Sequence, residues 1–510
     1  MRAVDLLLFA ALLVFAVSGF AAHSGRHVPA RMACLAVASA AGIAALALFH
    51  WQAIPALLLA ISLLVGTAVR RRVSRSAAAG SLRRRNVRRR IVGVVFLVAI
   101  AACALPYWAY PLLSFPAADG PLGVGVRDFD LVRSSGSREG LPDRQLRVRV
   151  WYPAQSMEGK PRSRYFSREE ALAQLPNYQY LHLFDVRTSA RVGAKPRADG
   201  GPWPAVIFNH GYLSYIAQNT ALAEHLASHG YVVFSVSHPH DGVSYRTVSG
   251  VRVESHPWKP SEPLVDSLER FIGDPTYEGR YAGYEAFRQA ISRDRLARSV
   301  RDWRDDDLYL ARHLDPRSAP AEIADIAALI DTEARAYAGM SFGGGTAATV
   351  CQADSRCKAA VSLDGVNWDL PLFDADLRAP LLLLQSDWLT HPLFPYQPRD
   401  ATTNPQDLAY ERWEDAGLRG DVYRYRVERG AHVGMMDLTL LARAPWRNRP
   451  YGEIDGRRAV DLMNEFTLAF LERYLRGVSS GFPADVEARF PEARPHRASG
   501  VRVWWRSRKG

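Results

Sequence analysis

A Gly-x-Ser-x-Gly pentapeptide about two-thirds of the way along the chain carries the residue best suited to nucleophilic chemistry. It comprises Gly339, Ser341 and Gly343, after the strand-like residues 336–338 and before a helix-like stretch. A sharp strand-to-helix turn of this kind raises the serine hydroxyl above the sheet, and its glycines avoid clashes. The following helix also favours negative charge beside the reacting carbon. The motif therefore predicts Ser341 as a nucleophile, and the alternative without chemistry is a glycine-rich turn with a capping serine.

A nucleophilic serine needs a base to remove its proton during attack. His432, in Gly-Ala-His-Val-Gly, follows the strand-like segment 421–427 and completes the chain order serine, acid, histidine. Alternative bases among the fourteen histidines are His238, His240 and His391. The first two lie in a His-Pro-His-Asp run that could hold a metal, but no second group of ligands with recognisable spacing accompanies it. We therefore expect neither a metal nor a cofactor.

Two aspartates and two backbone amides are available to complete the site. Asp364 and Asp387 each end a strand-like segment, so chain order alone leaves either one able to orient the imidazole. An oxyanion hole needs two N–H groups aimed at the developing charge. One is expected from Phe342, directly after the serine, and the other from Tyr212, in the loop after the strand-like segment 206–208.

Short apolar runs alternate with helix-length segments from Val126 onward, which predicts a mostly parallel sheet flanked by helices. We expect a catalytic domain over 126–490, a linker at 114–125 and a basic, flexible tail at 491–510. The polar segment 244–295 is too long for a simple connection and is expected to form a cap. The expected strands are 146–152, 205–208, 231–236, 336–338, 359–363, 380–384 and 421–427, and the expected helices are 219–228, 299–313, 342–352 and 457–476.

The positive charge is concentrated at the N-terminus. The net charge is +12, and residues 1–113 contain thirteen arginines, no lysine and one acid, Asp5, so the rest of the chain is near neutral. A nucleic-acid-binding protein needs a basic face on its folded domain. This distribution argues against nucleic acid as a partner.

Four apolar runs lie in the same stretch, and we expect residues 1–113 to form about four transmembrane helices. Ten arginines lie in Arg70–Arg90, between the third and fourth runs, and cytoplasmic loops carry such an excess. Everything after Leu113 is then extracytoplasmic, with the helices in a bacterial inner or cell membrane. A cleaved signal peptide is the alternative for the first run, but it would place the ten-arginine loop outside. The runs are Val4–Ala22, Met32–Phe49, Ile54–Val69 and Ile91–Leu113.

Several motifs follow one another between about Val126 and Arg476. They are Val148-Arg149-Val150-Trp151-Tyr152-Pro153-Ala154, Phe208-Asn209-His210-Gly211, Leu226-Ala227-Ser228-His229-Gly230-Tyr231, Gly339-Met340-Ser341-Phe342-Gly343-Gly344, Leu363-Asp364-Gly365 and His432. In these motifs the chain resembles the plasma-type (isoform II) platelet-activating-factor acetylhydrolase family of α/β-hydrolases, with an added N-terminal membrane region.

The resemblance implies an α/β-hydrolase fold with a mostly parallel, eight-stranded sheet, and a membrane-anchored serine esterase or lipase. In that family the acid follows the strand next to that of the nucleophile, in a Leu-Asp-Gly setting, which favours Asp364. The substrates implied are short-acyl or phospholipid-derived esters. Met340 departs from the family pattern, and Gly345 is similar to cutinase-like and polyester-degrading hydrolases, which take their acid from the position of Asp387.

Two rival classes of function remain. A catalytically inactive hydrolase fold could act as a binding module, although the intact serine, aspartate and histidine argue against this. The apolar helices could form a transporter or sensor, but such helices usually contain polar residues or breaks, and these runs are mainly Ala, Leu and Val. We therefore expect an ester substrate and a membrane as the partners of the chain.

Two cysteines of the predicted catalytic domain are close in sequence. Six residues of continuous helix separate Cα atoms by about 9 Å, beyond the roughly 7 Å limit for a disulfide. Cys351 and Cys357 can therefore pair only if the helix between them ends near Ala353.

Overall fold

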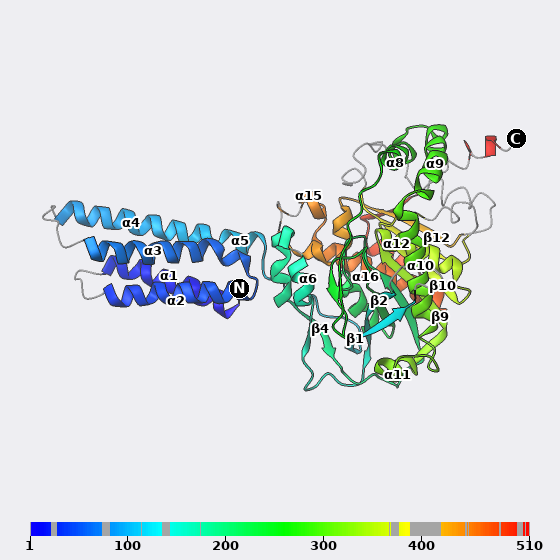
Figure 1. Ribbon diagram of the computed structural model, residues 1–510, viewed down its shortest axis with the longest axis horizontal. Helices are drawn as coiled ribbons and strands as arrows, with labels where there is room; N and C mark the ends of the chain where they lie inside the picture. The colour runs from blue at the N-terminus through cyan, green and yellow to red at the C-terminus, as the bar shows by residue number, and fades with distance from the viewer. Residues whose placement is uncertain are drawn as a thin grey trace. The chain divides into compact units, whose positions relative to one another are not determined.

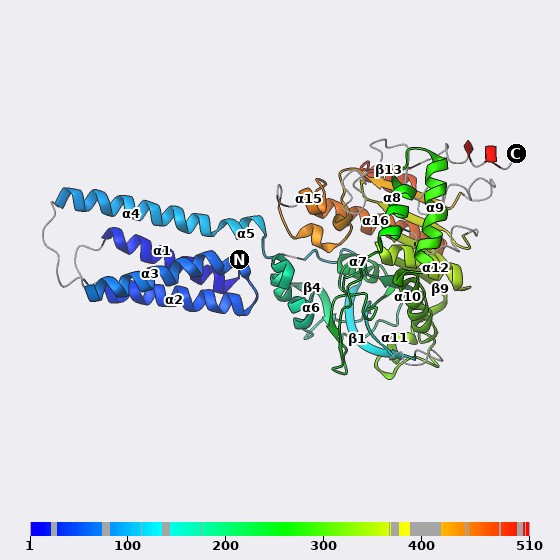
Figure 2. The same ribbon diagram turned by 45° about the horizontal axis from the view of Figure 1, so that its top comes forward.

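The chain forms two compact units in the computed structural model (Figures 1 and 2). The first unit comprises Met1–Ser114, Arg164–Val186 and Leu441–Trp446, and the second comprises Phe115–Ser163, Arg187–Leu440 and Arg447–Gly510. The residues that the structure describes are 2–21, 28–73, 82–113, 115–134, 143–173, 175–366, 368, 377–387, 420–443, 446, 448–478, 481–496, 503, 504 and 506–508.

Apolar helices make up most of the first unit: α1 (Ala3–Ala21), α2 (Val28–Ala47), α3 (Ile54–Val73), α4 (Leu82–Cys103) and the short α5 (Leu105–Ala109). Helix α1 packs against α2 and α4, and α2 packs against α3. Among the residues that the structure describes, three stretches are long and apolar enough to cross a membrane, Val28–Ala47, Trp51–Val69 and Ile91–Ala109, whereas the apolar part of α1, Ala3–Ser18, is shorter. The expected count of about four therefore corresponds to three helices of spanning length and one shorter helix.

Polar side chains also meet within the first unit. Asp5 of α1 is fully buried, accepts a hydrogen bond from the Tyr107 hydroxyl at 2.6 Å and contacts His50 Nδ1 at 3.2 Å. A buried carboxylate needs such partners because it has lost its water. The apolar runs therefore hold polar contacts that their mainly Ala, Leu and Val composition did not predict.

An eleven-stranded sheet forms the centre of the second unit, in the order β13-β12-β11-β10-β9-β5-β6-β2-β1-β4-β3. The strands from β6 to β12 pair in parallel, whereas β2 pairs antiparallel with both β6 and β1. The seven strands expected by residue range are present as β2, β5, β6, β9, β10, β11 and β12, and β1 completes the eight that the resemblance implied. Strands β3, β4 and β13 extend the sheet at its edges. The bounds are β1 Gly123–Arg133, β2 Arg144–Ala154, β3 Arg162–Arg164, β4 Arg187–Val192, β5 Trp203–Asn209, β6 Val232–Val236, β9 Ile330–Met340, β10 Cys357–Leu363, β11 Leu381–Gln385, β12 Val422–Val427 and β13 Ala493–Pro495.

Helices cover both faces of this sheet (Figure 1). Helices α7 (Thr220–Ser228) and α12 (Phe342–Ala353) connect successive parallel strands, as crossover helices do. Helix α12 packs against α10 (Arg295–Arg312), and α7 packs against α16 (Gly456–Leu475). The other α-helices and strands of the second unit are α8 Glu262–Gly273, α9 Tyr277–Ser292, α11 Ala324–Ala327, α15 Asn448–Tyr451, α17 Ala484–Arg489 and the hairpin of β7 Tyr245–Arg246 and β8 Arg252–Val253, whereas α6 Arg168–Ala173 belongs to the first unit.

Cys351 and Cys357 form a disulfide, with Cα atoms 5.2 Å apart. Helix α12 ends at Ala353, between the two cysteines, and the chain then turns into β10. The helix therefore ends where a bridge between Cys351 and Cys357 requires it to end.

The segment 244–295, expected to form a cap, contains the β7–β8 hairpin and the mutually packed helices α8 and α9. Leu264 of α8 and Phe287 of α9 belong to one apolar cluster with Trp303 and Phe342. The tail, expected to be flexible, contributes β13 and the buried Trp504, whose ring lies 5.8 Å from that of Tyr277. Segment 244–295 thus packs against Phe342, the residue that follows the predicted nucleophile.

Candidate active site

The predicted nucleophile lies in a sharp turn between β9 and α12. Ser341 has φ 56° and ψ −121°, a conformation that a non-glycine residue adopts only when its surroundings enforce it. Its amide donates to the carbonyl of Leu363 at 2.8 Å. A Cβ on Gly339 would lie 2.3 Å from the Gly343 backbone, which explains why glycine is needed there.

The structure brings Ser341, His432 and Asp364 together in one hydrogen-bonded chain. His432 Nε2 lies 2.9 Å from Ser341 Oγ, and His432 Nδ1 lies 2.7 Å from Asp364 Oδ2. Because a carboxylate only accepts, Nδ1 carries the proton and Nε2 is free to accept from the serine. Asp364 also accepts from the amide and hydroxyl of Ser386, at 2.8 and 2.6 Å, which hold the carboxylate in place.

The alternative acid and bases make other contacts. Asp387 accepts from the amide of Arg429 at 3.2 Å and lies 3.8 Å from Arg426 Nη1. His240 stacks on His256, with ring centroids 4.4 Å apart. His391 lies outside the described residues.

The loop expected to supply the second oxyanion donor lies against the serine turn. A Cβ on Gly343 would lie 2.2 Å from the carbonyl oxygen of Asn209, and a Cβ on Gly211 would lie 3.3 Å from Ser341 Cβ. The ring centroids of Tyr212 and Phe342 are 6.0 Å apart. Phe342 opens α12, so no preceding helical carbonyl accepts from its amide. Both expected donors therefore belong to segments that border Ser341.

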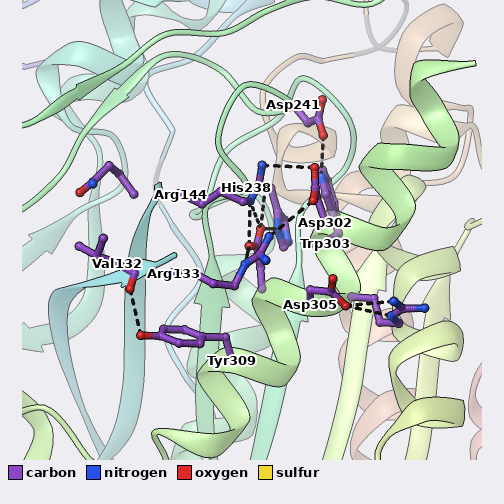
Figure 3. A network of polar contacts seen from close by, with 12 residues as sticks. Val132, Arg133, Arg144, His238, Asp241, Asp302, Trp303, Asp305 and Tyr309 are labelled. Carbon is purple, nitrogen blue, oxygen red and sulfur yellow. Dashed lines mark hydrogen bonds and ion pairs between the residues drawn. The ribbon is translucent and has the colours of Figure 1, made fainter. Parts of the chain in front are cut away.

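A buried polar network lies behind this loop and was not predicted from the sequence (Figure 3). Asp306, which is fully buried, accepts from Arg133 Nε at 2.7 Å, from Arg144 Nη2 at 2.7 Å and from His238 Nδ1 at 3.0 Å. Burial opposes ionisation of Asp306, but the charge of Arg144 and the hydrogen bonds from His238 and Arg144 together hold the pKa of that carboxyl below its ordinary value. An ionised carboxylate therefore connects β1, β2, β6 and α10.

The network reaches both oxyanion segments through His238 and Trp303. His238 Nε2 lies 2.7 Å from Asn209 Oδ1, and its ring stacks on Trp303 with centroids 3.8 Å apart. Trp303 in turn contacts Phe342 edge-on at 4.7 Å. One signal could have revealed this arrangement: Asp306 lies on the apolar stripe of α10, between Trp303 and Leu310, where an acid needs a buried partner.

Comparison with known proteins agrees with this architecture. The fold and the matches given below define a carboxylic ester hydrolase of the α/β-hydrolase class. Residues 109–259 match the family model "Platelet-activating factor acetylhydrolase, isoform II". The chain is 23% identical over 390 residues to the platelet-activating factor acetylhydrolase of Cavia porcellus, covering 72% of this chain and 79% of the relative. The corresponding protein of Canis lupus familiaris is 23% identical over 381 residues, covering 71% and 77%.

A solved esterase structure is also similar to this chain. The ferulic acid esterase from Streptomyces cinnamoneus has a TM-score of 0.56 and 25% identity, covering 75% of this chain and 98% of its own. These findings confirm the resemblance to isoform II platelet-activating factor acetylhydrolases and the carboxylic ester hydrolase class.

Gly343→Ala is expected to lower ester hydrolysis by about 10²-fold, because displacements near 1 Å at a catalytic site cost that much. The new Cβ would lie 2.2 Å from the Asn209 carbonyl and 2.5 Å from that of His210, and neither backbone can move without shifting the oxyanion loop. Steady-state kinetics on a chromogenic ester would measure the change. Gly420→Ala is the control, since its Cβ meets nothing within 4 Å. Equal activity in both variants would refute this close-contact argument.

Asp307→Asn is expected to stabilise the protein increasingly as the pH rises above about 4, the ordinary carboxyl range. Burial raises the pKa of Asp307 well above its ordinary value, although Asn209 donates to it at 2.7 Å. The folded state therefore holds this proton more tightly than the unfolded state, and wild type loses stability as pH rises through the raised pKa. Asparagine stays neutral throughout. Urea unfolding at pH 4 and pH 8 would measure the difference, with the partly exposed Asp305→Asn as control; a pH-independent difference would contradict the expectation.

Proposed function

We propose that this protein is a membrane-anchored serine esterase that uses Ser341, His432 and Asp364 to cleave carboxylic esters through an acyl-enzyme. The observation that carries the proposal is the pair of hydrogen bonds made by His432, 2.9 Å to Ser341 Oγ and 2.7 Å to Asp364 Oδ2. Serine attack needs a base, and a base needs an orienting acid. The strained backbone of Ser341 is further support, because nucleophile turns store such strain.

The mechanism begins with attack of Ser341 Oγ on the ester carbonyl while His432 Nε2 takes the hydroxyl proton. Asp364 stabilises the imidazolium that forms. The amides of Tyr212 and Phe342 donate to the oxyanion of the tetrahedral intermediate. His432 then protonates the departing alkoxide oxygen, and the acyl group stays on Ser341. Water attacks this acyl-enzyme with His432 again as the base, which releases the acid.

The substrate proposed is a short-acyl or phospholipid-derived ester. The curated relatives are platelet-activating factor acetylhydrolases, which supports an acetylated phospholipid. The three helices of spanning length support an anchor, and the ten arginines of Arg70–Arg90 support an extracytoplasmic catalytic domain.

Fluorophosphonate labelling tests the nucleophile. Wild type is expected to be labelled and to hydrolyse p-nitrophenyl acetate, and Ser341→Ala is expected to lose both. Ser355→Ala, an exposed serine beyond α12, is the matched control. Undiminished labelling of Ser341→Ala would end the proposal.

A lipid comparison tests the anchor and substrate together. The full chain is expected to hydrolyse acetylated phospholipid in vesicles faster than a truncated chain beginning at Asp119, while both hydrolyse a soluble ester equally. Equal rates on vesicles would reject the membrane-linked substrate but leave the esterase proposal intact.

A further inference from the structure

Three side chains with metal-binding atoms meet at the end of helix α7, and none belongs to the proposed active site. They are Asp119, which precedes β1, and His225 and His229, near and just beyond the end of the helix. Each offers one ligand atom, and these atoms lie within 4.8 Å of one another. Two imidazoles and a carboxylate are donors that zinc and similar divalent ions prefer.

The two imidazoles face the same side of the chain because they are four residues apart at a helix end. Their ring centroids are 4.5 Å apart. His229 Nδ1 donates to the carbonyl of His225 at 2.9 Å, which orients its ring and leaves Nε2 with a lone pair. Such a hydrogen bond from the second ring nitrogen is the usual way in which a metal-binding histidine is oriented.

His225 faces the Asp119 carboxylate through Nδ1. Its Nδ1 lies 2.6 Å from Asp119 Oδ1, whereas within the described part of the chain its Nε2 is buried without a hydrogen-bond partner. The whole residue is only 2% exposed. Nε2 lies on the side of the ring opposite Asp119, so Nδ1 is the atom through which His225 would share an ion with that carboxylate.

The backbone that carries Asp119 is held against the helix end. The amide of Gly120 donates to Ser228 Oγ at 3.0 Å, and the amide of Leu122 donates to the Ser228 carbonyl at 3.1 Å. A Cβ on Gly120 would lie 2.4 Å from that carbonyl oxygen, so only glycine permits the approach. The carboxylate and the two imidazoles are therefore brought together by rigid backbone on both sides.

The electrostatic setting favours a cation. The C-terminal end of a helix carries partial negative charge, and the cluster lies at that end of α7. Helix α16, which packs against α7, carries two further carboxylates, Asp461 and Glu465. Glu465 is paired with Arg489, so part of this negative charge is already balanced.

We propose that Asp119, His225 and His229 bind one divalent transition-metal ion of the zinc type, with water completing its coordination. The ion would join the segment before β1 to α7, the helix that follows the oxyanion loop. Its role is structural, because the three ligands share no residue with the proposed triad. Bound metal then stabilises the folded chain by mass action.

Metal binding to the purified full-length protein tests this site. After chelator treatment, the protein is expected to bind one equivalent of zinc in calorimetry. Bound zinc is expected to raise the melting temperature. Bound cobalt is expected to show the visible absorption of an ion with nitrogen and oxygen ligands. All measurements use a His432→Ala background, which removes the imidazole of the proposed triad as a competing ligand.

Asp119→Asn and His229→Gln are the informative variants, because neither residue is buried. Each is expected to weaken zinc binding by at least about tenfold and to abolish the thermal shift. Asp331→Asn and His256→Gln are the matched controls and should bind as the parent does. Unchanged binding in both informative variants, or no binding by the parent at micromolar zinc, would overturn the proposal and leave an ordinary aspartate–histidine ion pair.

Discussion

Asp364→Asn is expected to lower kcat for ester hydrolysis by about 10⁴-fold, the loss typical of an orienting acid, whereas Asp387→Asn should retain most activity. Asparagine can present an N–H to His432 Nδ1, which favours the tautomer with its proton on Nε2. That tautomer cannot accept the serine proton. Asp387 contacts Arg426 and Arg429, so its loss should affect the local loop more than the chemistry.

Steady-state kinetics and fluorophosphonate labelling of the two variants would measure this contrast. Ser386 should still donate to the amide oxygen of the Asp364→Asn variant, so the variant is expected to fold. Circular dichroism and the melting temperature are the controls for folding. Retained activity in Asp364→Asn together with its loss in Asp387→Asn would assign the acid to the position used by cutinase-like hydrolases.

Asp306→Asn is expected to reduce the free energy of unfolding by about 3–5 kcal/mol, the cost of breaking a buried ion pair. The substitution leaves the Arg133 and Arg144 guanidinium groups without the carboxylate that both contact at 2.7 Å. His238 would lose its Nδ1 partner as well. Because His238 also contacts Asn209, the variant should show a lower kcat even where it remains folded.

Urea unfolding would measure the stability change, and kcat would be measured at a temperature well below the unfolding transition. Asp305→Asn is the matched control, since it changes the adjacent residue of the same helix, whose partner is the partly exposed Arg304. A loss below about 1 kcal/mol, the range of an exposed pair, would show that the network contributes little. A loss of stability with unchanged kcat would show that the network stabilises the fold without influencing catalysis through the oxyanion loop.

Local sequence signals predicted the parts of the molecule that depend on neighbouring residues. The glycines around Ser341 predicted a strand-to-helix turn, because the steric demand arises within five residues. Helix-length segments between the strand-like runs located α7, α12 and α16 to within a few residues, and α16 also shows a broad apolar face. The short edge strands β3 and β13 were missed because three residues carry no readable alternation.

Contacts between distant residues depended on the tertiary structure. Chain order left Asp364 and Asp387 equivalent, and the family resemblance only favoured the first; the packing of β10 beside β9 brings Asp364 to 2.7 Å from His432. The disulfide depended on where α12 ends. The residues joined by Asp306 are separated by up to 173 positions, so no local pattern pairs them.

The sequence by itself thus determined Ser341 and His432 as candidates, the apolar helices and the charge partition, because these follow from residue type and short-range spacing. The tertiary structure decided which carboxylate contacts the histidine, which buried network lies behind the oxyanion loop, and which residues meet at the end of α7. The physical reason is that hydrogen bonds and ion pairs form between atoms a few ångströms apart, and only the packed chain determines which distant residues come that close.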